Sequence, residues 1–394
     1  MRTDYNLWVE QFRQAFPDST MPTFLARAPG RTELLGNHTD HQQGCVLCGA
    51  VDLTITACVA PRADKLVRIV SEGFGAFELN LDDIEPQRAE VGTSQALIRG
   101  VAAEFVRRGQ SVSGFDAYIS SQVLSGSGLS SSAAFEILVA NIFDHMAQAG
   151  FSPVEKAMMG QAAENRYFGK PCGLMDQIAC SVGGPVYIDF ADANAPMCEQ
   201  VSLNLAEFGY AMCIVDTRSD HGDLTEDYAA IPREMAAVSG WFGKSVLRQV
   251  PEEAFWSNLA PLRTQCGDRA VLRAMHFFRE QHRVLQARDA LKQGDFKHYL
   301  HLVDQSGRSS ELMLQNIWSA PQSQSVTLAI AVARQLLQGS GAVRVHGGGF
   351  AGTVQAYVPL KQLESFTAGM EAVFGPGCCH ELQLRPIGGE IMQL

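Results

Sequence analysis

The segment at residues 125–134, Ser-Gly-Ser-Gly-Leu-Ser-Ser-Ser-Ala-Ala, constrains the fold of this chain most strongly. It lies between a predicted strand at 115–119 and a predicted helix at 131–149. Its two glycines let the backbone approach a ligand and turn amides inward, and a helix N-terminus favours phosphate. The segment lacks the Gly-Lys-Ser/Thr of a Walker A loop and the third glycine of a dinucleotide fingerprint. Taken alone, it fits equally well a serine-rich loop that only caps the helix.

A second polar stretch, at residues 28–41, combines a cation, carboxylates, an amide and two imidazoles. Such a set suits recognition of a sugar, in which each polar group holds one hydroxyl. Two alternatives stay open. His38, Asp40 and His41 could ligate zinc, although adjacent positions seldom aim two side chains at one metal with good geometry. The stretch could also be a hydrated turn whose histidines have other partners.

A third segment carries two carboxylates. Ser152-Pro153-Val154-Glu155 is a capping box with proline at the first helical position, so a helix is expected from here to about residue 168, closed by Gly169. Glu164 on that helix could hold a divalent cation. Asp176 falls in the first turn of the next predicted helix, where the helix dipole keeps a carboxylate ionised. Such a placement is usually structural, but it also suits a catalytic base for phosphoryl transfer.

The length of 394 residues indicates two domains. The order of strands and helices is irregular, which predicts an α+β fold rather than a βαβ alternation. A break is expected between residues 191 and 207, which gives an N-terminal domain at 1–200 and a C-terminal domain at 201–394. Further strands are expected at 53–59, 65–70, 77–81, 182–190, 210–217, 341–346 and 353–358, and further helices at 5–16, 95–108 and over most of 231–338.

Charge and hydropathy exclude several classes of partner. With 42 acidic and 31 basic residues the net charge is −11, which repels nucleic acid and anionic lipid. The N-terminus has no apolar signal-peptide core, and no run of about 18 apolar residues predicts a membrane span. The chain is therefore expected to be a cytoplasmic protein, without a nucleic-acid or membrane partner, and a monomer.

The ten cysteines are expected to be reduced and largely buried, because a chain of this size needs no disulfides. Cys45 and Cys48 form one C-x-x-C motif. Without a second such pair, and in an apolar setting, the motif favours a strand over a zinc or redox site.

Taken in order, these segments resemble the galactokinase branch of the GHMP small-molecule kinases. Residues 30–41 match the family signature G-R-x-N-L-I-G-E-H-T-D-Y with substitutions, and residues 126–133 match its phosphate loop G-x-G-L-S-S-S-A. Residues 163–165 and 172–177 match A-E-N and C-G-x-M-D-Q. Residues 347–352 match the G-G-G-F-G-G loop with one alanine for glycine. The resemblance therefore covers nearly the whole chain.

The resemblance implies a kinase that uses ATP and Mg²⁺ to phosphorylate the anomeric hydroxyl of galactose or a related hexose. It implies an N-terminal mixed-sheet domain and a ferredoxin-like C-terminal domain, with the active site in the cleft between them. Asp176 would be the base, and Arg31 would orient it and stabilise the phosphoryl group. Ser132 and Glu164 would hold the metal. The implied ATP-binding residues are Gly126, Ser127, Gly128, Leu129, Ser130, Ser131 and Ser132, and the implied sugar-binding residues are Asn37, His38, Thr39, Asp40, Gly173, Asp176 and Tyr228.

Three polar positions of the family signature are changed in this chain. Glu33 replaces its asparagine, Asn37 its glutamate and His41 its tyrosine. In the family that glutamate helps to read the 6-hydroxyl end of the hexose, so an altered sugar, such as N-acetylgalactosamine, is an alternative substrate. If position 37 reads the sugar, Asn37→Glu should shift preference towards galactose.

Two other classes of function compete with a kinase. A non-catalytic sensor of sugar and ATP is one, but the intact Ser131-Ser132-Ala133-Ala134 of the phosphate loop favours catalysis. A dinucleotide-dependent oxidoreductase is the other, but the sequence predicts no strand–G-x-G-x-x-G–helix unit with a following acidic residue, which such an enzyme needs.

Overall fold

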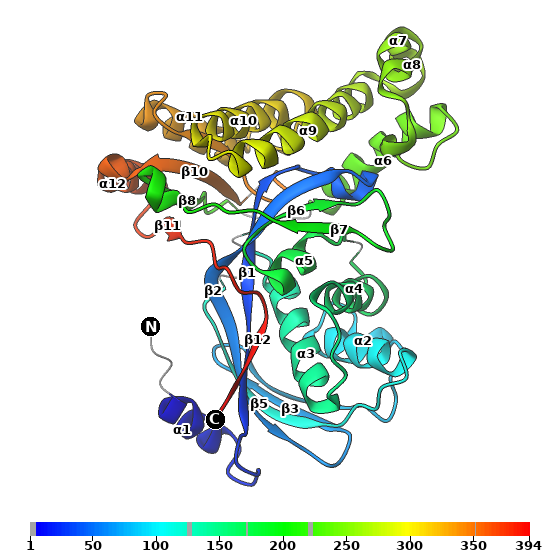
Figure 1. The fold of residues 1–394 in the computed structure, drawn as a ribbon, viewed down its shortest axis with the longest axis vertical. Coiled ribbons are helices and arrows are strands. Elements are labelled where there is room, and N and C mark those ends of the chain that lie inside the picture. The colour runs from blue at the N-terminus through cyan, green and yellow to red at the C-terminus, as the bar shows by residue number, and fades with distance from the viewer. Residues whose placement is uncertain (1–4, 124–127, 171, 220–223, 351) are drawn as a thin grey trace.

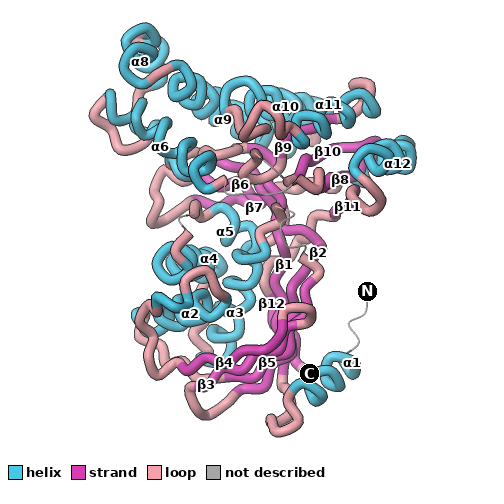
Figure 2. The backbone as a smooth tube through the Cα atoms, turned by 180° about the vertical axis from the view of Figure 1, so that it is seen from behind, coloured by secondary structure: helices cyan, strands magenta, loops and turns pink. Residues whose placement is uncertain are grey.

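The computed structural model describes residues 5–123, 128–170, 172–219, 224–350 and 352–394. These residues form two β-sheets with helices packed against them (Figure 1). The view from behind shows the same arrangement, with helices α2, α3 and α4 stacked against the strands of the first sheet (Figure 2). No helix in the described ranges combines the length and the apolar character needed to cross a membrane.

The first sheet is mixed and has eight strands, in the order β12-β1-β2-β5-β3-β4, with β6 and β7 added beside β2. Only the pairing of β3 with β5 is parallel. The polar stretch at residues 28–41, which the sequence predicts to bind a sugar, lies on β1 and on the turn that joins β1 to its long antiparallel partner β2. The strands are β1 Phe24–Leu35, β2 Cys45–Pro61, β3 Leu66–Ser71, β4 Gly75–Asn80, β5 Phe115–Ser121, β6 Pro185–Asp189, β7 Met197–Gln200 and β12 Glu390–Gln393.

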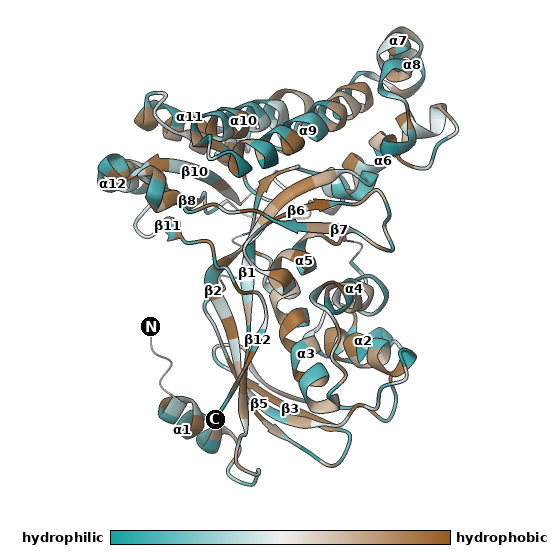
Figure 3. Cartoon of the chain, viewed as in Figure 1, coloured by the Kyte–Doolittle hydropathy of each residue, from teal (hydrophilic) through white to brown (hydrophobic). Residues whose placement is uncertain are grey.

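Four helices pack on one face of this sheet, and α1 (Tyr5–Ala15) packs on the other. The four are α2 Ser94–Arg107, α3 Ser131–Ala147, α4 Pro153–Ala163 and α5 Met175–Val182. The capping box predicted at Ser152 and Glu155 is present and starts α4. After Ala163 the helix continues as one π-helical turn, Glu164–Phe168, and Gly169 ends it in the left-handed conformation that glycine favours. Brown, apolar residues of α3 and α5 face the sheet (Figure 3).

The second sheet is antiparallel, in the order β11-β8-β10-β9. Helices separate β8 from β9, α12 separates β10 from β11, and this order is the ferredoxin-like topology. Successive residues of its strands face opposite cores: Cys213 and Val215 pack towards α11 and α12, while Met212 and Ile214 join the main core. The elements are β8 Tyr210–Asp216, α6 Thr225–Trp241, α7 Glu252–Ser257, α8 Leu259–Cys266, α9 Asp268–Lys292, α10 Phe296–Ser309, α11 Ser325–Leu337, β9 Ala342–Val345, β10 Thr353–Pro359, α12 Leu363–Phe374 and β11 Cys379–Leu382.

The structure differs from the sequence prediction in three places. The strand predicted from residue 182 begins at Pro185, because Val182 still belongs to α5. The stretch between 191 and 207 holds a short strand, β7, which pairs with β6. The last strand, β12, pairs with β1, so the end of the chain belongs to the first sheet although the division at residue 200 placed it in the second domain.

Candidate active site

Arg31 on β1 and Asp176 in the first turn of α5 form the centre of the site. The Arg31 Nε atom lies 2.7 Å from Asp176 Oδ1, and its Nη2 atom lies 2.8 Å from Oδ2. This forked pair fixes the plane of the carboxylate. Arg31 is buried, whereas the Asp176 side chain stays 32% exposed, so a substrate can reach the carboxylate.

The surroundings keep Asp176 ionised. Burial alone would raise the pKa of this carboxyl, but the charge and hydrogen bonds of Arg31 and the hydroxyl of Ser130 outweigh burial and lower the pKa below its ordinary value. The Ser130 hydroxyl donates to Asp176 Oδ2. Sequence inspection missed this role: Ser130 stands at the N-cap position of α3, but its side chain does not cap the helix.

The glycine-serine segment borders the same pair. The Arg31 backbone N–H donates to Leu129 O at 3.0 Å, and the Arg31 side chain donates to Gly128 O. Leu129 is buried, Ser131 is exposed, and α3 begins at Ser131. Gly126 and Ser127, which the sequence predicts to bind phosphate, lie outside the described residues. The described part therefore places a helix start directly beside the aspartate.

Glu164 and Ser132 contact each other. The Ser132 hydroxyl donates to Glu164 Oε1 at 3.2 Å, and Glu164 is only 3% exposed. The amide of Gln177 donates to Glu164 Oε2 at 2.9 Å and also to Glu136 Oε2 at 3.0 Å. Lys170 Nζ lies 3.5 Å from Glu164 Oε1. The sequence predicted no role for Gln177, Glu136 or Lys170, although Gln177 belongs to the family block at residues 172–177.

One hydroxyl and one carboxylate fit the way in which proteins hold Mg²⁺, which keeps most of its ligands as water and substrate phosphate oxygens. Gln177 fixes the Glu164 carboxylate, so Oε1 stays directed at Ser132. In the described part of the chain, no group of three or more His, Cys, Asp and Glu is arranged to hold a metal on its own. The site therefore fits a metal that arrives with a nucleotide.

The turn between β1 and β2, at residues 36–44 and called the signature turn below, supplies a second group of polar side chains, opposite the phosphate loop. Asp40 faces Gly173, where a Cβ atom would lie 1.7 Å from Asp40 Oδ2, so only glycine leaves room for this carboxylate. Burial, followed by the nearby charge of Asp176, raises the pKa of Asp40 to about 6. His38 Nε2 lies 3.0 Å from Gly348 O, and the Tyr228 hydroxyl donates to Gly349 O at 3.0 Å. His38 and Asp40 thus lie near the charge of Asp176, Gly173 faces Asp40, and Tyr228 contacts the same glycine loop as His38.

Asn37 and Thr39 are placed differently from the sequence expectation. Both side chains are fully buried. The Thr39 hydroxyl bonds to Gly36 O and Cys45 O, each at 2.8 Å, and closes the turn. The Asn37 amide points into the protein, where other protein groups occupy its hydrogen-bonding positions. Neither side chain is placed to meet a sugar, because Thr39 closes the turn and the Asn37 amide is bonded to Glu33 and to the distant Gly347 and Asn316.

The zinc alternatives gain no support from the geometry. Cys45 and Cys48 are buried on β2, as the apolar setting predicts, and all ten cysteines are free. The rings of His38 and His41 lie 5.7 Å apart. Burial and the neighbouring imidazoles lower the pKa of His41 to about 3, so this ring is neutral at physiological pH.

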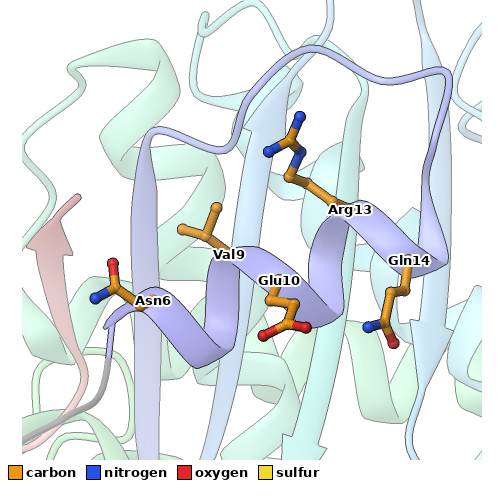
Figure 4. A pocket seen from close by; sticks show the side chains of 5 residues that line it. All are labelled: Asn6, Val9, Glu10, Arg13 and Gln14. Atoms are coloured by element: carbon orange, nitrogen blue, oxygen red, sulfur yellow. The ribbon is translucent and has the colours of Figure 1, made fainter.

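Outside this site, a depression of about 370 Å³ lies along α1 (Figure 4). Its lining residues, Asn6, Val9, Glu10, Arg13 and Gln14, follow one another at helical spacing. They form the outward side of α1, whose Phe12 faces the sheet. None of the residues predicted to carry chemistry lines this depression.

The fold and the site together define a GHMP kinase. Residues 96–184 match the GHMP kinase N-terminal domain, and residues 10–61 match the galactokinase galactose-binding signature. The galactokinase of Glaesserella parasuis serovar 5 (strain SH0165) is 30% identical over 361 residues, which cover 90% of each chain. The chain therefore belongs to the galactokinase family and is an ATP-dependent sugar kinase.

Solved structures agree on the fold. The crystal structure of Lactococcus lactis galactokinase complexed with galactose superimposes with a TM-score of 0.83 at 24% identity, over 100% of both chains. The Methanococcus jannaschii mevalonate kinase gives a TM-score of 0.65 at 14% identity, over 91% of this chain and 98% of that one. These likenesses confirm the α+β GHMP kinase fold that the sequence motifs predict.

Proposed function

We propose that this kinase transfers the γ-phosphoryl group of Mg-ATP to the anomeric hydroxyl of galactose or a closely related hexose. The observation that carries the proposal is the forked pair of Arg31 and Asp176, set between the phosphate loop and the signature turn. The names of the similar proteins, galactokinases from two bacteria, support galactose as the first sugar to test.

Asp176 would accept the proton of the attacking hydroxyl. Its Oδ2 atom already accepts from Arg31 and Ser130, whereas Oδ1 accepts from Arg31 alone and keeps a lone pair for the sugar. The anomeric oxygen would attack the γ-phosphorus, the bond to the β-phosphate would break, ADP would leave, and the proton would pass to Asp176. A low pKa is acceptable in this base, because a loose transition state demands proton removal only late.

Arg31 would orient Asp176 and stabilise negative charge on the phosphoryl group that is transferred. Ser132 and Glu164 would hold Mg²⁺, which supplies charge neutralisation by bridging phosphate oxygens when bound. Gln177 would keep Glu164 in place for this task. His38, Asp40, Gly173 and Tyr228 would form the wall that holds the sugar.

A panel of sugars tests the proposal. ADP release should be followed with galactose, N-acetylgalactosamine, glucose and mannose at matched concentrations, with product analysis for the sugar 1-phosphate. Galactose or a close analogue is expected to give the highest kcat/KM. Clear preference for N-acetylgalactosamine would support the alternative substrate, and tight ATP binding without turnover on any sugar would favour the sensor function.

The pH dependence of sugar binding should report on Asp40. Its pKa is raised from 3.8 to about 6, and the carboxylate form is the better acceptor for sugar hydroxyls. Below pH 6, the KM for the sugar should therefore rise, approaching about tenfold per pH unit, while the KM for ATP stays nearly constant. Stability should show the opposite trend: a raised folded-state pKa means that the sugar-free protein loses stability as pH rises from about 4 to 6.

Asp40→Asn is the control for this prediction, because it removes the titration. The variant should bind sugar more weakly at pH 7, and its sugar KM should no longer change between pH 5 and 7. A wild-type KM that is flat over this interval would argue against Asp40 as a sugar contact.

Gly173→Ala should specifically impair sugar binding. The new methyl group would overlap Asp40 Oδ2 and push this carboxylate aside. We expect the sugar KM to rise about tenfold, on the scale of one lost charged hydrogen bond, and the ATP KM to change little. Gly240→Ala on α6 is the matched control, because its Cβ would meet open space and should leave both KM values unchanged. Equal kinetics in the two variants would contradict the assignment.

A further inference from the structure

Two of the three polar departures from the family signature touch each other. Asn37 Nδ2 donates to Glu33 Oε2 at 3.1 Å, and both side chains are buried. In the signature quoted above, the amide stands first and the carboxylate four residues later. Here the carboxylate stands first and the amide follows. The chain therefore keeps one amide and one carboxylate but exchanges their places, and the two changes are one structural feature.

A buried arginine, Arg344, requires the carboxylate at position 33 as its counter-charge. The Arg344 guanidinium on β9 pairs with Glu33 and also donates to Glu33 O at 3.1 Å and Leu34 O at 2.9 Å. Both side chains of this pair are almost completely buried. Such a pair is tolerated only while its charges balance and its hydrogen bonds are made. A neutral group is thus needed at position 37, beside Glu33.

The other hydrogen bonds of the Asn37 amide hold the glycine loop at 347–349 in place. Its Nδ2 donates to Gly347 O at 2.7 Å, and its Oδ1 accepts from Asn316 Nδ2 at 2.8 Å. The same Asn316 amide donates to Gly348 O at 3.1 Å. A Cβ atom at Gly349 would lie 2.1 Å from Asn316 O, so the loop fits against this asparagine only as glycine.

The opposite side of this loop meets the sugar wall. His38 bonds to Gly348 O, and the Tyr228 hydroxyl donates to Gly349 O. The Tyr228 ring also lies against Gly348, where a Cβ atom would come within 2.5 Å of it. A shift of the loop would therefore move both His38 and Tyr228.

We propose that Asn37 is a positioning residue for sugar binding: it fastens the 347–349 loop that sets His38 and Tyr228, and it is matched to the buried pair of Glu33 and Arg344. The expected effect of Asn37 on sugar KM rests on the proposed function. Its expected effect on the unfolding temperature does not. The proposal replaces the expectation that Asn37 contacts the sugar. Asn37→Glu should not simply improve galactose binding. The new carboxylate would have no N–H to donate to Glu33 or to Gly347 O, the two acceptors that the Asn37 amide now serves.

A double-mutant cycle of Asn37 and Glu33 tests whether Asn37 is matched to the buried pair of Glu33 and Arg344. Asn37→Glu should lower the unfolding temperature by about 10 °C or more, since it buries a second carboxylate beside Glu33. Glu33→Asn should also destabilise, because it leaves Arg344 without its counter-charge. The combined variant restores one amide and one carboxylate and should recover at least half of the loss seen with Asn37→Glu. Additive losses, or a stable Asn37→Glu protein, would overturn the proposal. This measurement needs neither sugar nor ATP.

The role of Asn37 in sugar binding is tested with Asn37→Ala and the sugar from the panel that reacts fastest. Loosening the loop should raise the KM for every accepted sugar by a common factor of about ten, with the ATP KM unchanged. Asn141→Ala is the matched control, because Asn141 is equally buried on α3 but outside the site, so it should lower stability and leave the sugar KM unchanged.

The outcomes separate this inference from the function. If the factor differs strongly between sugars that differ at one hydroxyl, Asn37 reads the sugar directly and the positioning role is wrong. If Asn37→Ala does not fold, the unfolding temperatures of the cycle decide. If galactose is no substrate but another sugar is, the proposed substrate fails while both tests of Asn37 remain valid.

Discussion

Replacing Asp176 with asparagine is expected to lower kcat about 10³-fold, within the range usual for the loss of a general base. Asparagine keeps the shape of the side chain and one acceptor oxygen for Arg31. It cannot take up the proton of the sugar hydroxyl, and its NH₂ group would face an Arg31 donor in either orientation, with the Ser130 hydroxyl as a further neighbour at the Oδ2 position. Turnover should therefore fall, while the dissociation constants for ATP and sugar, measured by calorimetry, should stay within a few-fold.

Asp189→Asn is the matched control for this variant. Asp189 is also a partly buried aspartate paired with an arginine, Arg248, at 3.0 Å, but its carboxylate bonds only to Arg248 and the Ala191 N–H among the described hydrogen bonds, and neither is a predicted site residue. Its substitution should cost some stability and leave kcat unchanged. If Asp176→Asn keeps more than about a tenth of wild-type turnover, the carboxylate is not the base, and its value to the enzyme lies in orienting Arg31.

Local signals in the sequence predicted the elements that carry the site. The capping box at Ser152 and the glycine at 169 bound the helix of Glu164 by chemistry that acts within a few residues. The start of α5 near Asp176 and the strands on either side of the 347–352 loop were found for the same reason. The grouping of Arg31, Ser132, Glu164 and Asp176 was predicted only from the family resemblance, because these residues come from separate elements.

Tertiary pairings explain what the sequence could not predict. The strands β7 and β12 are four residues long, and each forms because a neighbour, β6 or β1, offers a free edge. The inward direction of Asn37 has a similar cause. Its partners Gly347 and Asn316 lie about 300 residues along the chain, so no local pattern distinguishes an amide that binds a sugar from one that holds a loop.

Arg31→Lys should lower kcat about 10²-fold or more, on the scale of one lost donor to developing charge. The arginine makes two contacts to Asp176 and a third to Gly128 O from three different nitrogens. Lysine keeps the positive charge, but its single ammonium group cannot serve both carboxylate oxygens and the loop carbonyl in one geometry. Asp176 should turn out of position, and the phosphate loop should lose its side-chain contact with β1 while the backbone bond from residue 31 to Leu129 O remains.

The size of the effect on kcat relative to KM identifies the role. Loss of transition-state charge stabilisation lowers kcat and kcat/KM together, so the sugar KM should stay within about threefold. Arg68→Lys is the matched control, because Arg68 makes the same forked contact to Asp116, at 2.8 and 2.7 Å, far from the site on β3. It should reduce stability alone. A rise in sugar KM with unchanged kcat in Arg31→Lys would instead make Arg31 a ground-state binding group, and the charge-stabilising role would then fall to Lys170 or to the metal proposed to bind at Glu164.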